Sequence, residues 1–178
     1  TISWKTLLKS WGIVYLGNLV GCVIAALVFA FSAGIINNGG TMSIFDPNQN
    51  LSAYLGTQTA LMAQDKVSQG FGTLLIKGVA CNWLVCLAVW LSVAAEDVPG
   101  KIIGLWFPVV AFAASGFEHS VANMFFIPLG MANGANVTIA QFLFSNLLPV
   151  TLGNILGGAV LVGAAYWWVY GKPNPTCN

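Results

Sequence analysis

The chain has 178 residues, of which 57% are hydrophobic and only 6% are charged, and its formal net charge is +1. Soluble domains carry about 25% charged residues, so this composition excludes an ordinary soluble domain and indicates an integral membrane protein in a lipid bilayer. The small net charge gives no support to a nucleic-acid partner. The single histidine and the four cysteines show no metal-ligand spacing, so we expect neither a metal nor a cofactor.

Four apolar stretches are candidates for membrane spans, each of which needs about 20 residues. They cover residues 4–34, 67–95, 102–131 and 139–170. Residues 43–64 are mixed in character, and we expect an extramembrane connection there, with a short helix after Leu51. The chain is therefore predicted to be one transmembrane domain over residues 1–178.

The third stretch is interrupted by polar residues. Residues 102–116 would form a helix of about 22 Å, which is too short to cross about 30 Å of hydrocarbon. We therefore expect two half-helices with a non-helical break at residues 117–123. Irregular backbone at that depth must line a cavity or be buried in protein. Ionisable residues at membrane depth mark functional sites, so Glu118 and His119 are candidates for handling a proton or an ion.

The lysines predict the orientation of the chain in the membrane. Lys5, Lys9, Lys101 and Lys172 all fall on one side of the predicted spans. Cytoplasmic loops carry an excess of lysine and arginine. We therefore expect a multi-pass protein of the cell's inner (plasma) membrane with a cytoplasmic C-terminus.

A short motif occurs in both the first and the last predicted span. Residues 16–21 (LGNLVG) recur as residues 152–157 (LGNILG). Glycines four apart let two helices approach closely, and the alternative is chance recurrence. Since these two spans cross in opposite directions, the motif favours an inverted repeat. By that symmetry about two further spans should precede Thr1, and the nearer one should also be broken.

Three stretches of the chain resemble the formate/nitrite transporter family, whose relatives include formate, nitrite and hydrosulfide channels. They are residues 77–90 (KGVACNWLVCLAVW), 114–125 (ASGFEHSVANMF) and 146–154 (NLLPVTLGN). The resemblance covers essentially the whole chain. It implies an all-α membrane protein with an aquaporin-like inverted-repeat helical bundle of six spans, assembled as a homopentamer with one pore per protomer. This chain resembles only the last four of those six spans, with one broken helix.

The resemblance also implies roles for individual residues. His119 would be the central pore histidine, and Asn154 a polar contact near it. Lys66 would be the basic residue at the outer entrance of the pore. Phe112 and Val85 would belong to the two apolar constrictions.

Each of these residues also has an ordinary structural interpretation. His119 could be a buried histidine satisfied by backbone, and Lys66 a solvated lysine. Phe112 and Val85 could be packing residues. Asn154, like Asn18 in the first copy of the motif, could bond between helices.

For two charged residues, the sequence leaves more than one role open. For Glu118 we favour a structural carboxylate that caps the second half-helix over direct proton transfer. Lys77 could extend its ammonium group towards the membrane surface, pair with Glu118 or face the vestibule of the pore.

The function implied by the resemblance is a channel or transporter for a small monovalent weak-acid anion: formate, nitrite or hydrosulfide. Protons would be the second partner, because His119 can change charge near physiological pH. Alternatives are an aquaporin-like pore for water or small neutral solutes, and a purely structural subunit. An enzyme with Glu118 and His119 as an acid–base pair is disfavoured, since no nucleophile, metal cluster or nucleotide-binding loop accompanies them, and we assign no catalytic residue.

Overall fold

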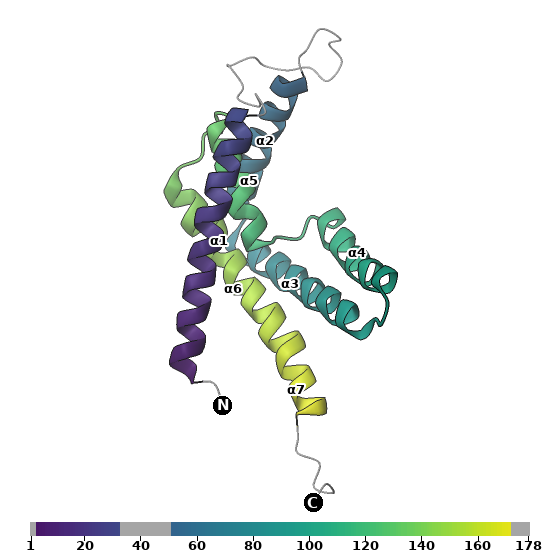
Figure 1. The fold of residues 1–178 in the computed structure, drawn as a ribbon. Helices are drawn as coiled ribbons and strands as arrows, with labels where there is room; N and C mark the ends of the chain where they lie inside the picture. Colours follow the sequence, from purple (N-terminus) through teal and green to yellow (C-terminus); the bar gives the residue numbers. More distant parts are fainter. Residues whose placement is uncertain (1–2, 33–50, 172–178) are drawn as a thin grey trace, which may run out of the picture. The chain divides into compact units, whose positions relative to one another are not determined.

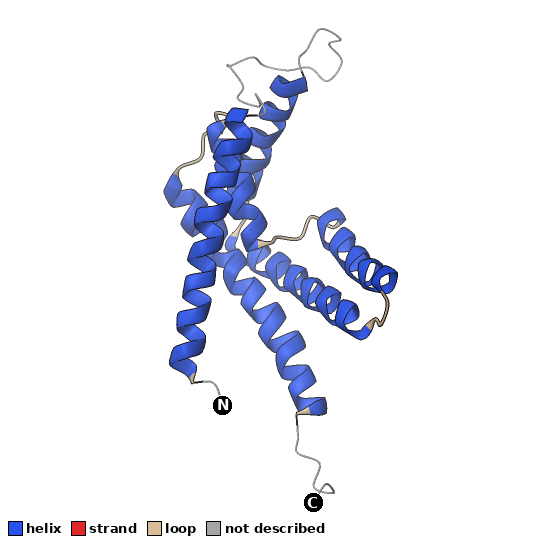
Figure 2. Cartoon of the chain, in the orientation of Figure 1, coloured by secondary structure: helices blue, strands red, loops and turns tan. Residues whose placement is uncertain are grey.

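The computed structural model describes residues 3–32 and 51–171 (Figure 1). All regular secondary structure in those residues is helical (Figure 2). The helices are α1 (Trp4–Ser32), α2 (Leu51–Ser68), α3 (Phe71–Ala94), α4 (Val98–Ala114), α5 (Ser120–Ala132), the π-helix η1 (Gln141–Leu147), α6 (Leu148–Leu156), the π-helix η2 (Gly157–Ala164) and α7 (Ala165–Tyr170). They fall into two compact units. The first comprises Thr1–Gln69 and Val121–Leu147, and the second Gly70–Ser120 and Leu148–Asn178.

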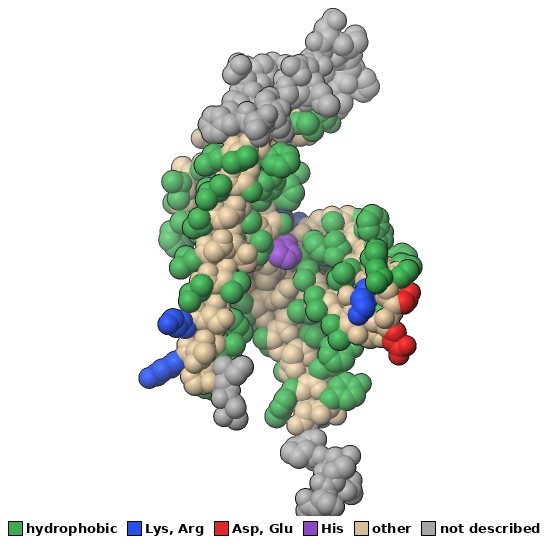
Figure 3. Space-filling view, viewed as in Figure 1, with side chains coloured by type: hydrophobic (Ala, Val, Ile, Leu, Met, Phe, Trp, Pro, Cys, Tyr) green, Lys and Arg blue, Asp and Glu red, His purple; other side chains and the backbone are tan. Residues whose placement is uncertain are grey.

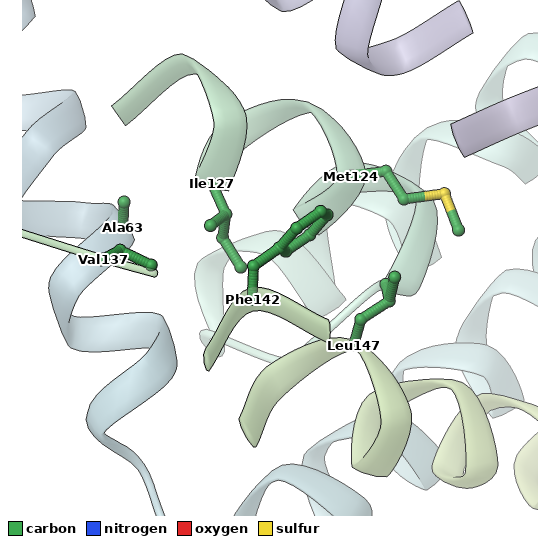
Figure 4. Close-up of a cluster of buried hydrophobic side chains, with 6 residues drawn as sticks. All are labelled: Ala63, Met124, Ile127, Val137, Phe142 and Leu147. Carbon is green, nitrogen blue, oxygen red and sulfur yellow. The ribbon is translucent and has the colours of Figure 1, made fainter. Parts of the chain in front are cut away.

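The first unit is built from α1, α2, α5 and η1 around a small apolar core. The buried side chains of that core, drawn in Figure 4, are Ala63, Met124, Ile127, Val137, Phe142 and Leu147. Gly130 of α5 lies directly against Thr59 and Ala63 of α2, where a Cβ atom would overlap with them. Close approach of two helices in a membrane requires such small residues.

A buried amide pair joins the elements of the first unit. Asn123 of α5 donates from its side chain to the carboxamide oxygen of Asn146 at 2.8 Å, and Asn146 donates to the backbone oxygen of Lys66 at 2.7 Å. Both asparagines are completely buried. Hydrogen bonds of this kind satisfy amides that would be costly to bury alone.

The second unit is organised around α3, which packs against α4 and against the helix formed by α6 and η2. The turn between α3 and α4 is closed by Asp97, whose carboxylate accepts a hydrogen bond from the N–H of Gly100 at 3.3 Å. Aspartate at this position satisfies one of the free N–H groups of the first helical turn. Asp97 is therefore the N-cap of α4.

Within the described residues, three helices are long and apolar enough to cross a membrane: Trp4–Ala30, Phe71–Ala94 and Gln141–Tyr170. The last is continuous through η1, α6, η2 and α7. Large hydrophobic side chains are exposed over α1, α4 and α7, as Figure 3 shows. Such a surface is expected to face lipid or another subunit rather than water.

Two predicted boundaries are corrected by the structure. The expected short helix after Leu51 is an 18-residue helix, α2, that runs to Ser68. The span predicted from residue 67 begins at Phe71, because α2 and a two-residue connection occupy residues 67–70. Residues 33–34 and 43–50 lie outside the described residues.

Candidate functional site around His119

The non-helical break lies at residues 115–119, rather than at the predicted 117–123, because residues 120–123 already belong to α5. It begins where α4 ends at Ala114. Gly116 has a positive φ of 64°, a conformation that glycine adopts without strain. The N–H of Gly116 donates to the oxygen of Ala113 at 3.2 Å, and that of Phe117 to the oxygen of Phe112 at 3.1 Å. These two bonds form a Schellman motif, which satisfies the last carbonyls of the helix.

The backbone on both sides of His119 is held by hydrogen bonds. The N–H of Glu118 donates to the oxygen of Lys77 on α3 at 3.4 Å. The oxygen of Glu118 accepts from the side chain of Asn154 on α6 at 3.0 Å, and the N–H of Ser120 donates to the Asn154 side-chain oxygen at 2.9 Å. His119 is therefore carried on a short segment anchored to two helices of the same unit.

Asn154 is the centre of this arrangement. Its second side-chain N–H donates to the oxygen of Gly78 at 2.9 Å, so both donors of the carboxamide are engaged with backbone oxygens. Its side-chain oxygen acts as the N-cap of α5, although Asn154 belongs to another helix. This geometry fits the interpretation that Asn154 forms hydrogen bonds between helices. A contact between Asn154 and a substrate stays a prediction.

His119 itself is half-buried, and its ring lies beside that of Phe112. The two ring centroids are 6.0 Å apart, with the planes at 35°. A cation at about this distance from an aromatic ring is attracted to the ring. The structure thus brings together a group that can gain a proton and an apolar ring that was predicted to form a constriction.

The remaining predicted residues are placed as follows. Glu118 is buried, with 3% of its surface exposed. Its carboxylate was expected to cap α5, and the cap seen for the Ser120 N–H is Asn154. Val85 is half-buried on α3 of the same unit, and Lys66 is half-buried in the last turn of α2 of the first unit. The roles of Val85 and Lys66 stay predictions.

Sequence reasoning assigned no role to Asn82 and Gly158. Asn82 of α3 donates from its side chain to the backbone oxygen of Asn154 at 2.7 Å. A Cβ atom on Gly158 would lie 2.6 Å from that side-chain nitrogen. An amide in the middle of an apolar helix needs a partner, and that was the available signal for Asn82. In the described residues, no group of three or more histidine, cysteine or acidic side chains could hold a metal.

Comparison with known proteins finds relatives of this chain among membrane transporters and channels. The family model described as "Formate/nitrite transporter" matches residues 1–168. The chain is 44% identical over 173 residues to a probable formate transporter of Methanothermobacter thermautotrophicus, covering 93% of this chain and 60% of that protein. It is 35% identical over 191 residues to the formate channel FocA of Escherichia coli K12, covering 97% of this chain and 62% of that protein.

A solved structure gives the same likeness in three dimensions. It is described as a pentameric formate channel with formate bound, and it matches with a TM-score of 0.79 and 35% identity over 97% of this chain and 69% of the other. The chain spans about three fifths of the length of the two curated relatives.

Proposed function

Because this chain belongs to the formate/nitrite transporter family, we propose that it forms part of a transmembrane pore for formate and similar small monovalent weak-acid anions. The family is one of transporters and channels, not of enzymes. The observation that carries the proposal is the position of His119, between two half-helices and beside Phe112. An ionisable group in such a break is the usual mark of a transport site.

The chemistry of a weak-acid anion explains why a histidine suits this position. A bare charge in a low-dielectric passage costs several kcal/mol even after relaxation. An imidazole has an ordinary pKa of about 6.5 and can therefore gain a proton at physiological pH. A protonated His119 stabilises the anion, or gives it the proton so that the neutral acid crosses the apolar constrictions at Phe112 and Val85. Passage is then coupled to protons and increases as the pH falls.

Lys66 supplies attraction at the entrance in this proposal. A fixed positive charge raises the local concentration of anions and the rate at which they arrive. Glu118 stays structural, because it is buried and its backbone is bonded on both sides.

The assembly follows the solved relative, which is described as a pentamer with formate bound. The active form is then a homopentamer in the inner membrane, with its C-terminus in the cytoplasm. Each protomer has six spans in an inverted repeat, and residues 1–178 supply the last four as a single transmembrane domain. Nitrite and hydrosulfide belong to the same class of substrate.

A pore for water or small neutral solutes is the alternative, and the relatives named above give it no support, since they are named for formate. The test is transport by the full-length gene product in proteoliposomes. Formate, nitrite and hydrosulfide uptake are measured between about pH 5 and pH 8, together with osmotic swelling. Formate uptake that rises as the pH falls supports the proposal. Swelling without anion uptake would contradict it.

A further inference from the structure

We propose that Asn82 is a positioning residue for His119 and acts through Asn154. This inference rests on the proposed function, because it concerns the same site. Asn82 lies in the middle of α3, and its side chain reaches across to α6, where it donates to the backbone oxygen of Asn154 at 2.7 Å. Its effect on the histidine is therefore indirect.

A short chain of hydrogen bonds connects Asn82 with the backbone of the break. Asn82 fixes the backbone of Asn154 against α3. The side chain of Asn154 then bonds the oxygen of Glu118 at 3.0 Å and the N–H of Ser120 at 2.9 Å. These two residues flank His119 directly. A shift of α6 relative to α3 would therefore move the histidine.

The spacing of residues explains why a single amide can set this position. Gly78 and Asn82 are four residues apart on α3, and so are Asn154 and Gly158 on the facing helix, so each pair lies on one helix face. The side chain of Asn154 bonds Gly78 at one level, and that of Asn82 bonds Asn154 about one turn further along α3. The two bonds run in opposite directions between the same two helices. They define the register of the helices as well as their separation.

Glycines leave the space that Asn82 needs. A Cβ atom on Gly153 would overlap with the oxygen of Leu75, and one on Gly157 with the oxygen of Val79, so the two backbones are in direct contact. A Cβ atom on Gly158 would lie 2.6 Å from the side-chain nitrogen of Asn82. Gly158 thus keeps open the place that the donor occupies.

The experiment compares two variants that displace this donor by different means. Asn82→Leu removes the donor with little change in size, and Gly158→Ala fills its place and changes no polar group. Gly163→Ala is the matched control, because its Cβ would meet only an ordinary contact at 3.4 Å. The full-length protein is reconstituted in proteoliposomes. We measure formate uptake against pH and the elution of the purified oligomer.

We expect both variants to elute like the unsubstituted protein and to lower uptake about fivefold, the effect of one net hydrogen bond. We also expect the pH midpoint of uptake to shift by about half a unit or more, because the half-buried ring lies beside Phe112 and a displaced imidazole would be solvated differently. Gly163→Ala should match the unsubstituted protein. In a His119→Asn background, Asn82→Leu should have no further effect on the pH profile, because the two changes act on one unit.

Two results would overturn the inference. One is an unchanged pH midpoint in both variants. The other is a uniform loss of uptake that follows a loss of assembled protein, which would make Asn82 a stability residue only. Failure of the proposed function looks different, because the unsubstituted protein would then show no formate uptake at any pH.

Discussion

The side-chain oxygen of Asn154 accepts a hydrogen bond from the backbone N–H of Ser120 at 2.9 Å, across 34 positions of the sequence. Ser120 is the first residue of α5, so the cap of this helix comes from α6. A buried N–H without a partner is costly, and Asn154 of α6 supplies the acceptor for the first N–H of the second half-helix. The break that carries His119 is therefore a property of the packed unit, not of the local sequence alone.

Asn154→Leu should lower the free energy of unfolding by about 2–4 kcal/mol. The substitution leaves the oxygens of Gly78 and Glu118 and the N–H of Ser120 buried without this partner, at about 1–3 kcal/mol for each group before relaxation. Asn154→Asp keeps the acceptor and loses the donors, so its stability should lie between those of the parent and the Leu variant. Thermal unfolding in detergent measures both, and a Leu variant as stable as the parent would show that these bonds are not formed.

Gly116→Ala should destabilise the protein by about 1–2 kcal/mol, because an L side chain at positive φ is strained. In the described part of the chain, the new Cβ would point into open space, so the cost is conformational. Gly116→Asn should recover part of it, since asparagine tolerates this region. The control is Gly72→Ala on α3, which also has open space at its Cβ and should be neutral or slightly stabilising. Equal effects at the two glycines would argue against the turn at Gly116.

Gly157→Leu should prevent α3 and the helix of α6 and η2 from packing. Even a Cβ at this position would overlap with the oxygen of Val79, and overpacking of this kind costs about 1–3 kcal/mol or more. We expect little assembled protein in size-exclusion chromatography. Gly163→Ala, with only an ordinary contact at 3.4 Å, should assemble normally. A normal oligomer with leucine at 157 would be inconsistent with the close approach.

Lys66→Ala should reduce formate uptake most strongly at low ionic strength. At 0.1 M salt, the attraction of anions by an entrance charge is screened beyond about 10 Å. In dilute solution the attraction reaches much further. Lys66→Arg keeps the charge and should behave like the parent. The test is the initial uptake rate of each variant relative to the parent at a series of salt concentrations. An equal loss at every salt concentration would mean that Lys66 does not steer the substrate.

Much of the fold could be predicted because membrane spans are local and compositional. The long apolar stretches around α1, α3 and the helix Gln141–Tyr170 were located from hydrophobicity alone. The family was predicted from three motifs and is confirmed by the family model over residues 1–168. Close helix contact at Gly153 and Gly157 was predicted from their spacing and is confirmed. In the first copy of the motif, a Cβ on Gly17 or Gly21 would meet none of the described residues outside α1 within 4 Å.

The boundaries of the break could not be predicted because they depend on distant partners. Residues 120–123 include polar side chains and were predicted to be irregular, yet α5 begins at Ser120 because Asn154 caps it. Asn82 was missed for the same reason, since its acceptor lies 72 positions away. The length of α2 was missed because its mixed composition resembles that of a connecting loop.

The pH dependence of formate uptake in proteoliposomes made with His119→Asn and His119→Phe tests the proton-donor role of His119 most directly. Both variants should still form the oligomer, because the bonds from Asn154 to Glu118 and Ser120 are made by backbone and carboxamide atoms and survive the substitution. The rise of uptake at low pH should be lost, and anion selectivity should change. Uptake with an unchanged pH response in either variant would contradict the proton-donor role.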